Sequence, residues 1–166
     1  MTEARQLEPT VVEARDALAT AGTLQLALGA LASSLSDRYP ISRISVRTYD
    51  PRADELEFVG VWSAGPTYLG SGIRVPARST SFAEVELHGS SMLGRPDGRG
   101  GPLLDQIVGD EGNRAWVVVP LVRDRLLMGL LSVSTWEPDG FTSDDLPFFD
   151  ALARAIGERL LELAGA

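Results

Sequence analysis

Residues that could carry catalysis or hold a metal are scarce in this sequence. It has no cysteine, which excludes disulfides, thiolate catalysis and cysteine-ligated zinc or iron–sulfur sites. Its single histidine, His88, is the one side chain suited to act as a neutral base or a haem ligand near pH 7. A surface histidine that ends a short helix before Gly89 is the simpler interpretation. We expect no metal, no haem and no other cofactor.

Two further motifs invite a chemical interpretation and have a simpler one. Asp144 and Asp145 could form a pair of catalytic acids, but they stand where a helix is expected to begin, and carboxylates are favourable at that helix end. Residues 98–101 are glycine-rich but lack the Gly-Lys-Ser/Thr of a phosphate-binding loop. Since no nucleophile–base pair is visible, we expect that the chain is not an enzyme.

The charge balance argues against binding to nucleic acid. The 166 residues include 15 basic residues, all arginine, and 23 acidic residues, so the net charge is −8. Affinity for nucleic acid requires basic side chains that neutralise phosphates, and an acidic surface repels them. We therefore expect no direct contact with nucleic acid.

Hydropathy gives no indication of a membrane segment. The longest apolar runs, residues 116–122 and 126–133, fall well short of the about 20 residues that a membrane helix needs. The N-terminus has no apolar core behind a basic start, so no signal peptide is expected. We expect a cytoplasmic protein with no membrane contact, a frayed or disordered segment at residues 1–9 and a single domain at residues 10–166.

A long helix is predicted near the N-terminus, over residues 10–36. Apolar side chains recur there every three or four positions, which is typical of one apolar helix face. Gly22 weakens the middle, and Tyr39-Pro40 ends the helix because the residue before proline avoids helical dihedral angles. The face consists of Val11, Ala14, Leu18, Ala21, Leu24, Leu28, Leu31 and Leu35.

Alternating side chains predict a β-hairpin after this helix. Residues 44–50 and 56–63 each read as a half-buried strand, joined by turn-forming residues. In the first strand, Ile44, Val46 and Thr48 oppose Ser45, Arg47 and Tyr49; in the second, Leu56, Phe58, Gly60 and Trp62 oppose Glu57, Val59 and Val61. A third short strand is expected at residues 73–75.

Two more strands are predicted at residues 116–122 and 127–135. Both are apolar over most of their length, which favours central strands covered on both faces. The two groups of strands are joined by residues 77–114, which we call the middle segment. Its sequence predicts short helices at 82–88 and 103–108, separated by a mobile glycine- and proline-rich loop at 94–102.

The last helix begins near residues 141–145, and its apolar side chains again recur at three and four positions. They are Leu146, Phe149, Ala153, Ile156, Leu160 and Leu163. Helices at the two ends of an antiparallel sheet pack together on one of its faces. The other face is then left to the middle segment.

The second half of the chain resembles a GAF domain. Residues 113–121, Asn-Arg-Ala-Trp-Val-Val-Val-Pro-Leu, stand where the family has a strand ending in Val-Pro-Leu, and residues 128–133 resemble its Gly-Val-Leu strand. Residues 141–146, Phe-Thr-Ser-Asp-Asp-Leu, resemble its Phe-Thr-x-x-Asp-Leu helix start. The resemblance implies an α+β, GAF-like (PAS-related) fold. Its antiparallel sheet has five to six strands, and the N- and C-terminal helices pack on one face.

Departures from the family argue against its known specialised activities. Members that reduce free methionine sulfoxide use cysteines, bilin-binding members attach the chromophore to cysteine, and this chain has none. The Asn-Lys-Phe-Asp-Glu signature of the cyclic-nucleotide members is also absent. The resemblance therefore implies the general family role, which is small-molecule sensing or regulated dimerisation in signalling proteins.

The resemblance also suggests where a ligand would bind. It places the pocket at the strand ends and the middle segment, and ligand pockets are mainly apolar and aromatic. We expect a pocket bounded by Trp62, Tyr68, Phe82 and Trp116, with polar contacts from Glu84, His88 and Ser91. The alternative is that these aromatic side chains simply fill the core.

A homodimer is predicted from the width of the apolar helix faces. One apolar face of the helices is enough to cover the sheet. The remaining apolar surface is expected to pack against a second copy of the chain, as in a symmetric four-helix bundle. The expected interface residues are Leu24, Leu28, Leu31, Leu35, Phe149, Ile156, Leu160 and Leu163. The predicted function is a bacterial-type signalling sensor that acts through this dimer on an effector domain or partner protein. The alternatives are helices that satisfy each other within one chain, and an interaction module without a ligand.

Overall fold

A computed structural model describes residues 8–67, 69–96 and 103–166. Its centre is a six-stranded antiparallel sheet in the order β3-β2-β1-β6-β5-β4, so the predicted α+β GAF-like fold is confirmed. The strands are β1 (Arg43–Asp50), β2 (Glu55–Ser63), β3 (Arg74–Pro76), β4 (Met92–Gly94), β5 (Ala115–Arg123) and β6 (Leu126–Thr135). Of the predicted frayed or disordered segment at residues 1–9, residues 1–7 lie outside the described residues, and helix α1 begins at Pro9. The predicted ligand residue Tyr68 and residues 97–102 of the predicted loop at 94–102 also lie outside them, while Gly94 ends β4.

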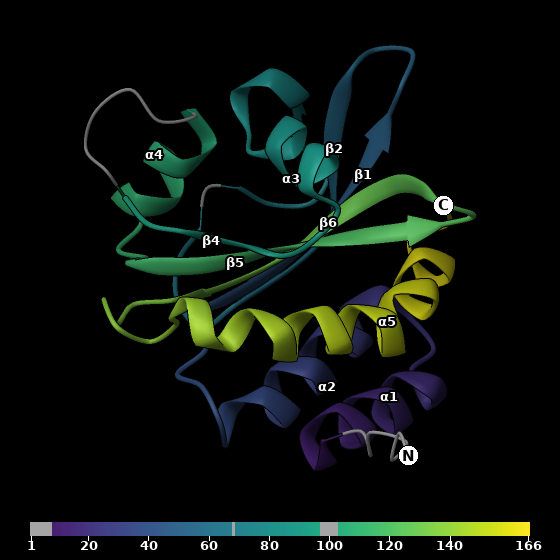
Figure 1. The fold of residues 1–166 in the computed structure, drawn as a ribbon, viewed down its shortest axis with the longest axis vertical. Helices are drawn as coiled ribbons and strands as arrows, with labels where there is room; N and C mark the ends of the chain where they lie inside the picture. Colours follow the sequence, from purple (N-terminus) through teal and green to yellow (C-terminus); the bar gives the residue numbers. More distant parts are fainter. Residues whose placement is uncertain (1–7, 68, 97–102) are drawn as a thin grey trace, which may run out of the picture.

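Helices cover both faces of the sheet (Figure 1). The terminal helices α1 (Pro9–Thr20), α2 (Leu24–Ser36) and α5 (Leu146–Leu163) lie together on one face, which we call the helix face. The short helices α3 (Phe82–His88) and α4 (Leu103–Asp110) lie on the other, which we call the pocket face. Among the described residues, none of the helices is both long and apolar enough to cross a membrane.

The prediction of one helix over residues 10–36 is wrong, because the chain breaks it into α1 and α2. Ala21 is extended, and Thr23 caps α2 by accepting a hydrogen bond from the Leu26 amide at 3.2 Å. Gly22 lies between them, where glycine weakens a helix most. The break allows α1 to turn back against α2 and α5.

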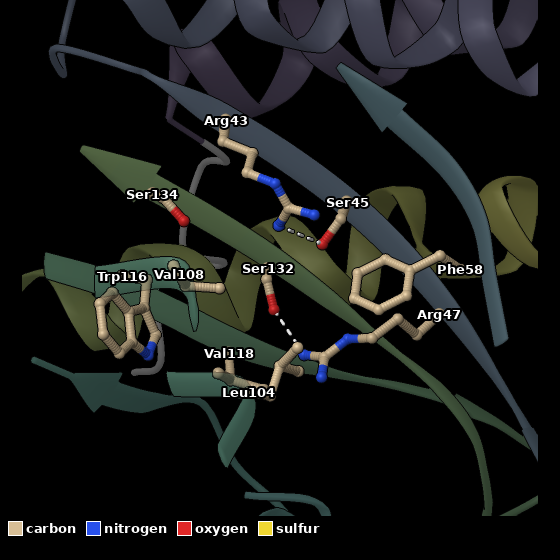
Figure 2. Close-up of a pocket in the computed structure, with 10 residues that line it drawn as sticks. All are labelled: Arg43, Ser45, Arg47, Phe58, Leu104, Val108, Trp116, Val118, Ser132 and Ser134. Carbon is tan, nitrogen blue, oxygen red and sulfur yellow. Dashed lines mark hydrogen bonds between the residues drawn. The ribbon is translucent and has the colours of Figure 1, made fainter. Parts of the chain in front are cut away.

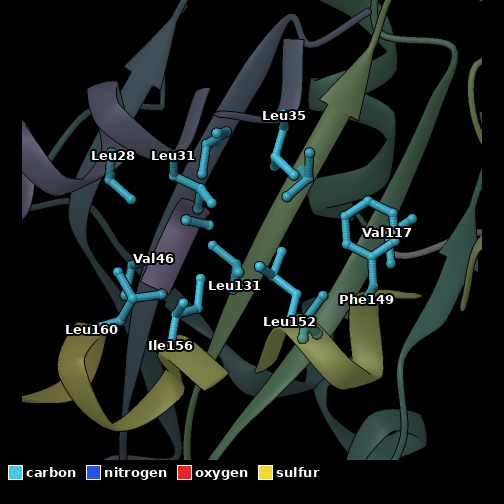
Figure 3. Packing of buried hydrophobic residues seen from close by; sticks show 14 of the residues in the cluster. Leu28, Leu31, Leu35, Val46, Val117, Leu131, Phe149, Leu152, Ile156 and Leu160 are labelled. Carbon is cyan, nitrogen blue, oxygen red and sulfur yellow. The ribbon is translucent and has the colours of Figure 1, made fainter. Parts of the chain in front are cut away.

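The helix face holds the larger apolar cluster (Figure 3). Alternate residues of the central strands, such as Val46, Val117 and Leu131, point into it. The helices contribute most of the predicted dimer interface, namely Leu24, Leu28, Leu31, Leu35, Phe149, Ile156 and Leu160, all buried within one chain, while Leu163 is half-buried against them. Those side chains are therefore unavailable to a second copy, because the sheet uses the apolar seam that we assigned to a dimer.

An aromatic group closes one end of this cluster. The Tyr39 ring packs against Phe141, Phe148 and Phe149 at centroid distances of 5.2–5.6 Å. Its hydroxyl donates to Asp145 Oδ1 at 3.0 Å. Burial and this hydrogen bond raise the pKa of Tyr39 to about 12.

Strand β4 was not predicted, because it has only three residues. It pairs with one end of β5, where Gly94 lies opposite Trp116. A Cβ atom on Gly94 would lie 1.9 Å from the Trp116 indole nitrogen, so glycine is required for the ring to pack there. The same pairing brings the centre of the segment at residues 77–114 onto the edge of the sheet.

Candidate functional site

The pocket face of β1 carries polar side chains that are buried. Because side chains alternate along a strand, Ile44 and Val46 point to the helix face while Arg43, Ser45 and Arg47 point to the pocket face. Arg43 and Arg47 are each only 3% exposed. The predicted half-buried strand is thus wrong for this part of β1, which is covered on both sides.

A small cavity lies beside these arginines (Figure 2). Its walls come from β1, from Phe58 of β2, from Trp116 of β5 and from Ser132 and Ser134 of β6. Leu104 and Val108 of α4 cover it. The cavity volume is about 20 Å³, which is room for a single water molecule.

Hydrogen bonds fix both guanidinium groups within this site. Arg47 Nη2 donates to Ser132 Oγ at 2.7 Å. Arg43 Nη1 donates to Ser45 Oγ at 3.3 Å, and its Nη2 donates to the Leu69 carbonyl oxygen at 3.0 Å. The Phe58 ring lies near both cations. Its centroid is 5.4 Å from Arg43 Cζ and 5.7 Å from Arg47 Cζ. The site therefore places two guanidinium groups beside serine hydroxyls, a backbone carbonyl oxygen and an aromatic ring.

Electrostatics at Arg43 reflect its burial. Removal from water lowers the pKa of Arg43, and the negative charge of Glu111 opposes this in part. Arg43 and Glu111 do not form an ion pair with each other, because none of the described carboxylates lies within 4.0 Å of the Arg43 guanidinium. The Glu111 carboxylate instead accepts hydrogen bonds from the Thr67 hydroxyl at 2.9 and 3.1 Å.

Of the predicted ligand residues that the structure describes, Trp116 is the one that lines this cavity. Phe82 is buried on the same face, where its ring stacks on that of Tyr49 with the two ring centroids 4.2 Å apart. It does not line the cavity. Glu84 and His88 are exposed on α3 and point away from the apolar cluster of the pocket face. Glu84 and His88 are therefore not brought together with Trp116, whereas Phe82 shares the apolar cluster of the pocket face with it.

Trp62 lies on the opposite face of the sheet. A β-bulge at Val59 changes the pairing from Val46–Gly60 to Arg47–Phe58, which moves the residues after it to the other face. Trp62 consequently pairs with Ile44 and packs against the helix-face cluster. The predicted place of Trp62 in the pocket is wrong for this reason.

Ser91 occupies the sheet edge rather than the cavity. Its amide donates to Asp150 Oδ1 at 2.8 Å, and its buried hydroxyl has no hydrogen-bond partner in the described part of the chain. This contact ties the segment after α3 to helix α5. Because the contact to Asp150 uses the backbone amide, the predicted polar contact from the Ser91 hydroxyl to a ligand stays a prediction.

Sequence reasoning missed the main polar residues of the site, namely Arg43, Ser45, Arg47, Ser132 and Ser134. The signal was present, because these side chains alternate with apolar residues that must face the terminal helices. The middle segment was also expected to cover the other face. Combining the two expectations would have indicated buried arginines.

The arrangement of the described side chains offers no site for a metal ion. Within residues 8–67, 69–96 and 103–166, no group of three or more His, Asp or Glu side chains is placed to hold a metal ion. The site instead offers guanidinium and hydroxyl donors, which suit polar or anionic groups.

Known structures share this fold at low sequence identity. The GAF domain of a phosphoenolpyruvate-protein phosphotransferase from Coxiella burnetii is 14% identical over 99% of this chain and 98% of its own, with a TM-score of 0.74. Free methionine-R-sulfoxide reductase from Neisseria meningitidis, solved in complex with its substrate, is 18% identical over 94% and 89%, with a TM-score of 0.70. The chromophore-binding domain of the R. palustris bacteriophytochrome RpBphP3 is 16% identical over 94% and 60%, with a TM-score of 0.67.

These likenesses establish the fold, and the sequence itself establishes the family. No curated protein matches the sequence significantly. The sequence profile of the GAF domain matches residues 5–160, which is most of the chain. The resemblance seen in the strand and helix motifs is thereby confirmed, and this chain belongs to the GAF domain family.

Proposed function

We propose that this GAF domain is a sensory module that binds a small polar molecule between the sheet and α4. The observation that carries the proposal is the set of buried arginine and serine side chains around the cavity. Burying polar groups costs free energy, and a fold that needed only stability would place apolar residues there. The helix face of the same strands does so, with Ile44, Val46 and Val133.

Helix α4 is the natural cover of this site. A cavity of about 20 Å³ holds no more than a water molecule, so a larger occupant requires α4 to move outward. Leu104 and Val108 are the buried side chains by which α4 packs over the cavity. Loss of these contacts on binding is the conformational step that we propose.

Occupancy can reach the helix face by two routes. Arg43 and Arg47 flank Ile44 and Val46, so a shift of β1 on one face moves apolar side chains on the other. The hydrogen bond from the Ser91 amide to Asp150 connects the middle segment with α5. An effector domain or partner protein that contacts the terminal helices would sense either change.

An interaction module without a ligand is the second candidate, and the small volume of the cavity favours it. In that case a homodimer would have to use the outer surfaces of the helices, where Leu26 is 64% exposed. Light scattering of the wild-type chain tests the dimer directly. A mass near 17.8 kDa at micromolar concentration would contradict it.

Native mass spectrometry and thermal unfolding against a panel of metabolites test the sensory proposal. A ligand should raise the unfolding midpoint of the wild type, and Ser132→Val should reduce this effect because it removes a hydroxyl from the cavity wall. Ser33→Val, on the exposed surface of α2, is the matched control and should retain it. A ligand that stabilises wild type and Ser132→Val equally would place binding elsewhere.

A further inference from the structure

We infer that the pocket recognises a small oxyanion, the carboxylate or phosphate group of a metabolite, and that Arg43 binds it. This inference rests on the proposed function, because it assigns a ligand class to the same cavity. It goes beyond that proposal in predicting that charge, rather than shape or hydroxyl contacts, decides what binds.

The hydrogen bonds of Arg43 leave part of its guanidinium unused. Arg43 is 3% exposed, and its Nε–H group has no acceptor among the residues that the structure describes. Each Nη atom makes one hydrogen bond, and both acceptors are neutral oxygens, from Ser45 and Leu69. A guanidinium carries five N–H donors, so donors remain for another group.

Two surface arginines show what is missing at Arg43. Arg74 lies at the surface and contacts three carboxylates, those of Asp50, Glu55 and Glu57, at 2.8–3.2 Å. Arg123 likewise pairs with Glu158 at 3.1 Å. Water already solvates such exposed cations, whereas the buried cation of Arg43 has no carboxylate within 4.0 Å among the described residues.

Burial without a counter-charge is costly for a guanidinium, because it does not lose its proton under physiological conditions. The Phe58 ring and the two neutral hydrogen bonds offset this cost only in part. An anion in the cavity would offset it more fully, since hydrogen bonds between charged groups are about twice as strong as neutral ones.

The surroundings suit an oxyanion in particular. The edge of a guanidinium presents parallel N–H donors that match the two oxygens of a carboxylate or phosphate group. Figure 2 shows Arg43 and Arg47 reaching from the same strand toward the cavity, with Ser132 and Ser134 on the neighbouring strand β6. Serine hydroxyls rotate and can donate to a bound oxygen.

Titration calorimetry with three probes at constant ionic strength tests the inference: inorganic phosphate, succinate and its uncharged analogue succinamide. Phosphate or succinate should bind the wild type, and the comparison of the two distinguishes a phosphate site from a carboxylate site. Arg43→Gln should weaken binding at least tenfold, while Arg52→Gln, a matched change at an exposed arginine, should leave it unchanged. Succinamide should not bind.

A second measurement needs no variant and covers the case in which Arg43→Gln does not fold. The NMR signal of the Arg43 Nε–H group in the wild type should shift on addition of the bound anion. Anion binding without that shift, or equal loss in both arginine variants, would overturn the inference. Uncharged metabolites that bind in a Ser132-dependent way would overturn it while leaving the proposed function intact. A panel in which no compound of any charge binds would contradict both.

Discussion

The two faces of the sheet bury different kinds of side chains in this protein. On the helix face, most strand positions that point inward carry an apolar side chain, and the terminal helices fill the space around them. On the pocket face, the same strands present Arg43, Arg47 and Ser132 to a small cavity under α4. The difference teaches that burial alone does not define a core. The helix face holds the larger apolar core, and the pocket face combines a smaller apolar core with buried polar groups.

Truncation on the helix face should have the largest effect. Phe149 is fully buried and contacts Tyr39, Phe141 and Phe148. Phe149→Ala should lower the free energy of unfolding by about 4 kcal/mol, measured by urea denaturation, because it removes apolar contacts and leaves a cavity. Val122→Ala, at an exposed position of β5, should cost less than about 0.5 kcal/mol. Similar losses in the two variants would refute a core centred on the helix face.

Alkaline pH should lower the free energy of unfolding by an intermediate amount, and Tyr39 should contribute more to this loss than Tyr49. The pKa values of Tyr39 and Tyr49 are both raised to about 12, the first mainly by burial and the second mainly by a hydrogen bond to Asp54. A raised pKa stabilises the fold below pH 10, and that stability is lost as the pH rises from 10 to 12. The loss at Tyr39 should reach about 2 kcal/mol.

The sequence makes this measurement unusually clean. There is no lysine, so tyrosines are the side chains that titrate in this range. Tyr39→Phe should remove most of the loss between pH 10 and 12, and Tyr49→Phe should remove less of it, because Tyr49 is partly exposed. The reverse order of the two variants would show that burial at the helix face is not the main cause.

Neutralisation on the pocket face should have the smallest effect and the opposite sign. Arg43→Met keeps an apolar stem of similar length and removes a buried cation that has no described carboxylate partner. We expect the free energy of unfolding of the ligand-free variant to be about 1 kcal/mol higher than that of the wild type. Apolar replacements of buried charges are often neutral or stabilising. A loss of more than about 2 kcal/mol would indicate that Arg43 is a structural residue.

Local patterns predicted most of the fold. The apolar spacing in α5 and the alternation in β1, β2, β5 and β6 follow from which side chains must reach the helix face. The break at Gly22 was missed because the three- and four-residue spacing continues through it. Strand β4 was missed because three residues show no alternation, and its existence depends on pairing with β5.

The site was harder to predict because it depends on contacts between distant segments. Polar residues such as Arg43 and Ser45 look like the solvent side of a strand unless α4 is known to cover them. Trp62 was placed on the wrong face because the bulge at Val59 is a property of the β1–β2 pairing and leaves no mark in the local sequence. The dimer seam at Leu160 was misread for a similar reason, since the sheet that it covers is formed elsewhere in the chain.

The central claim is that a ligand enters the pocket face, and backbone NMR during titration with phosphate or succinate tests it most directly. We predict that the largest shift changes fall on Arg43, Arg47, Val108 and Ser132, with smaller changes reaching α5 through Asp150. Largest changes at Trp62, at His88 or on the outer surface of α1 would contradict the account, because those residues lie away from the cavity.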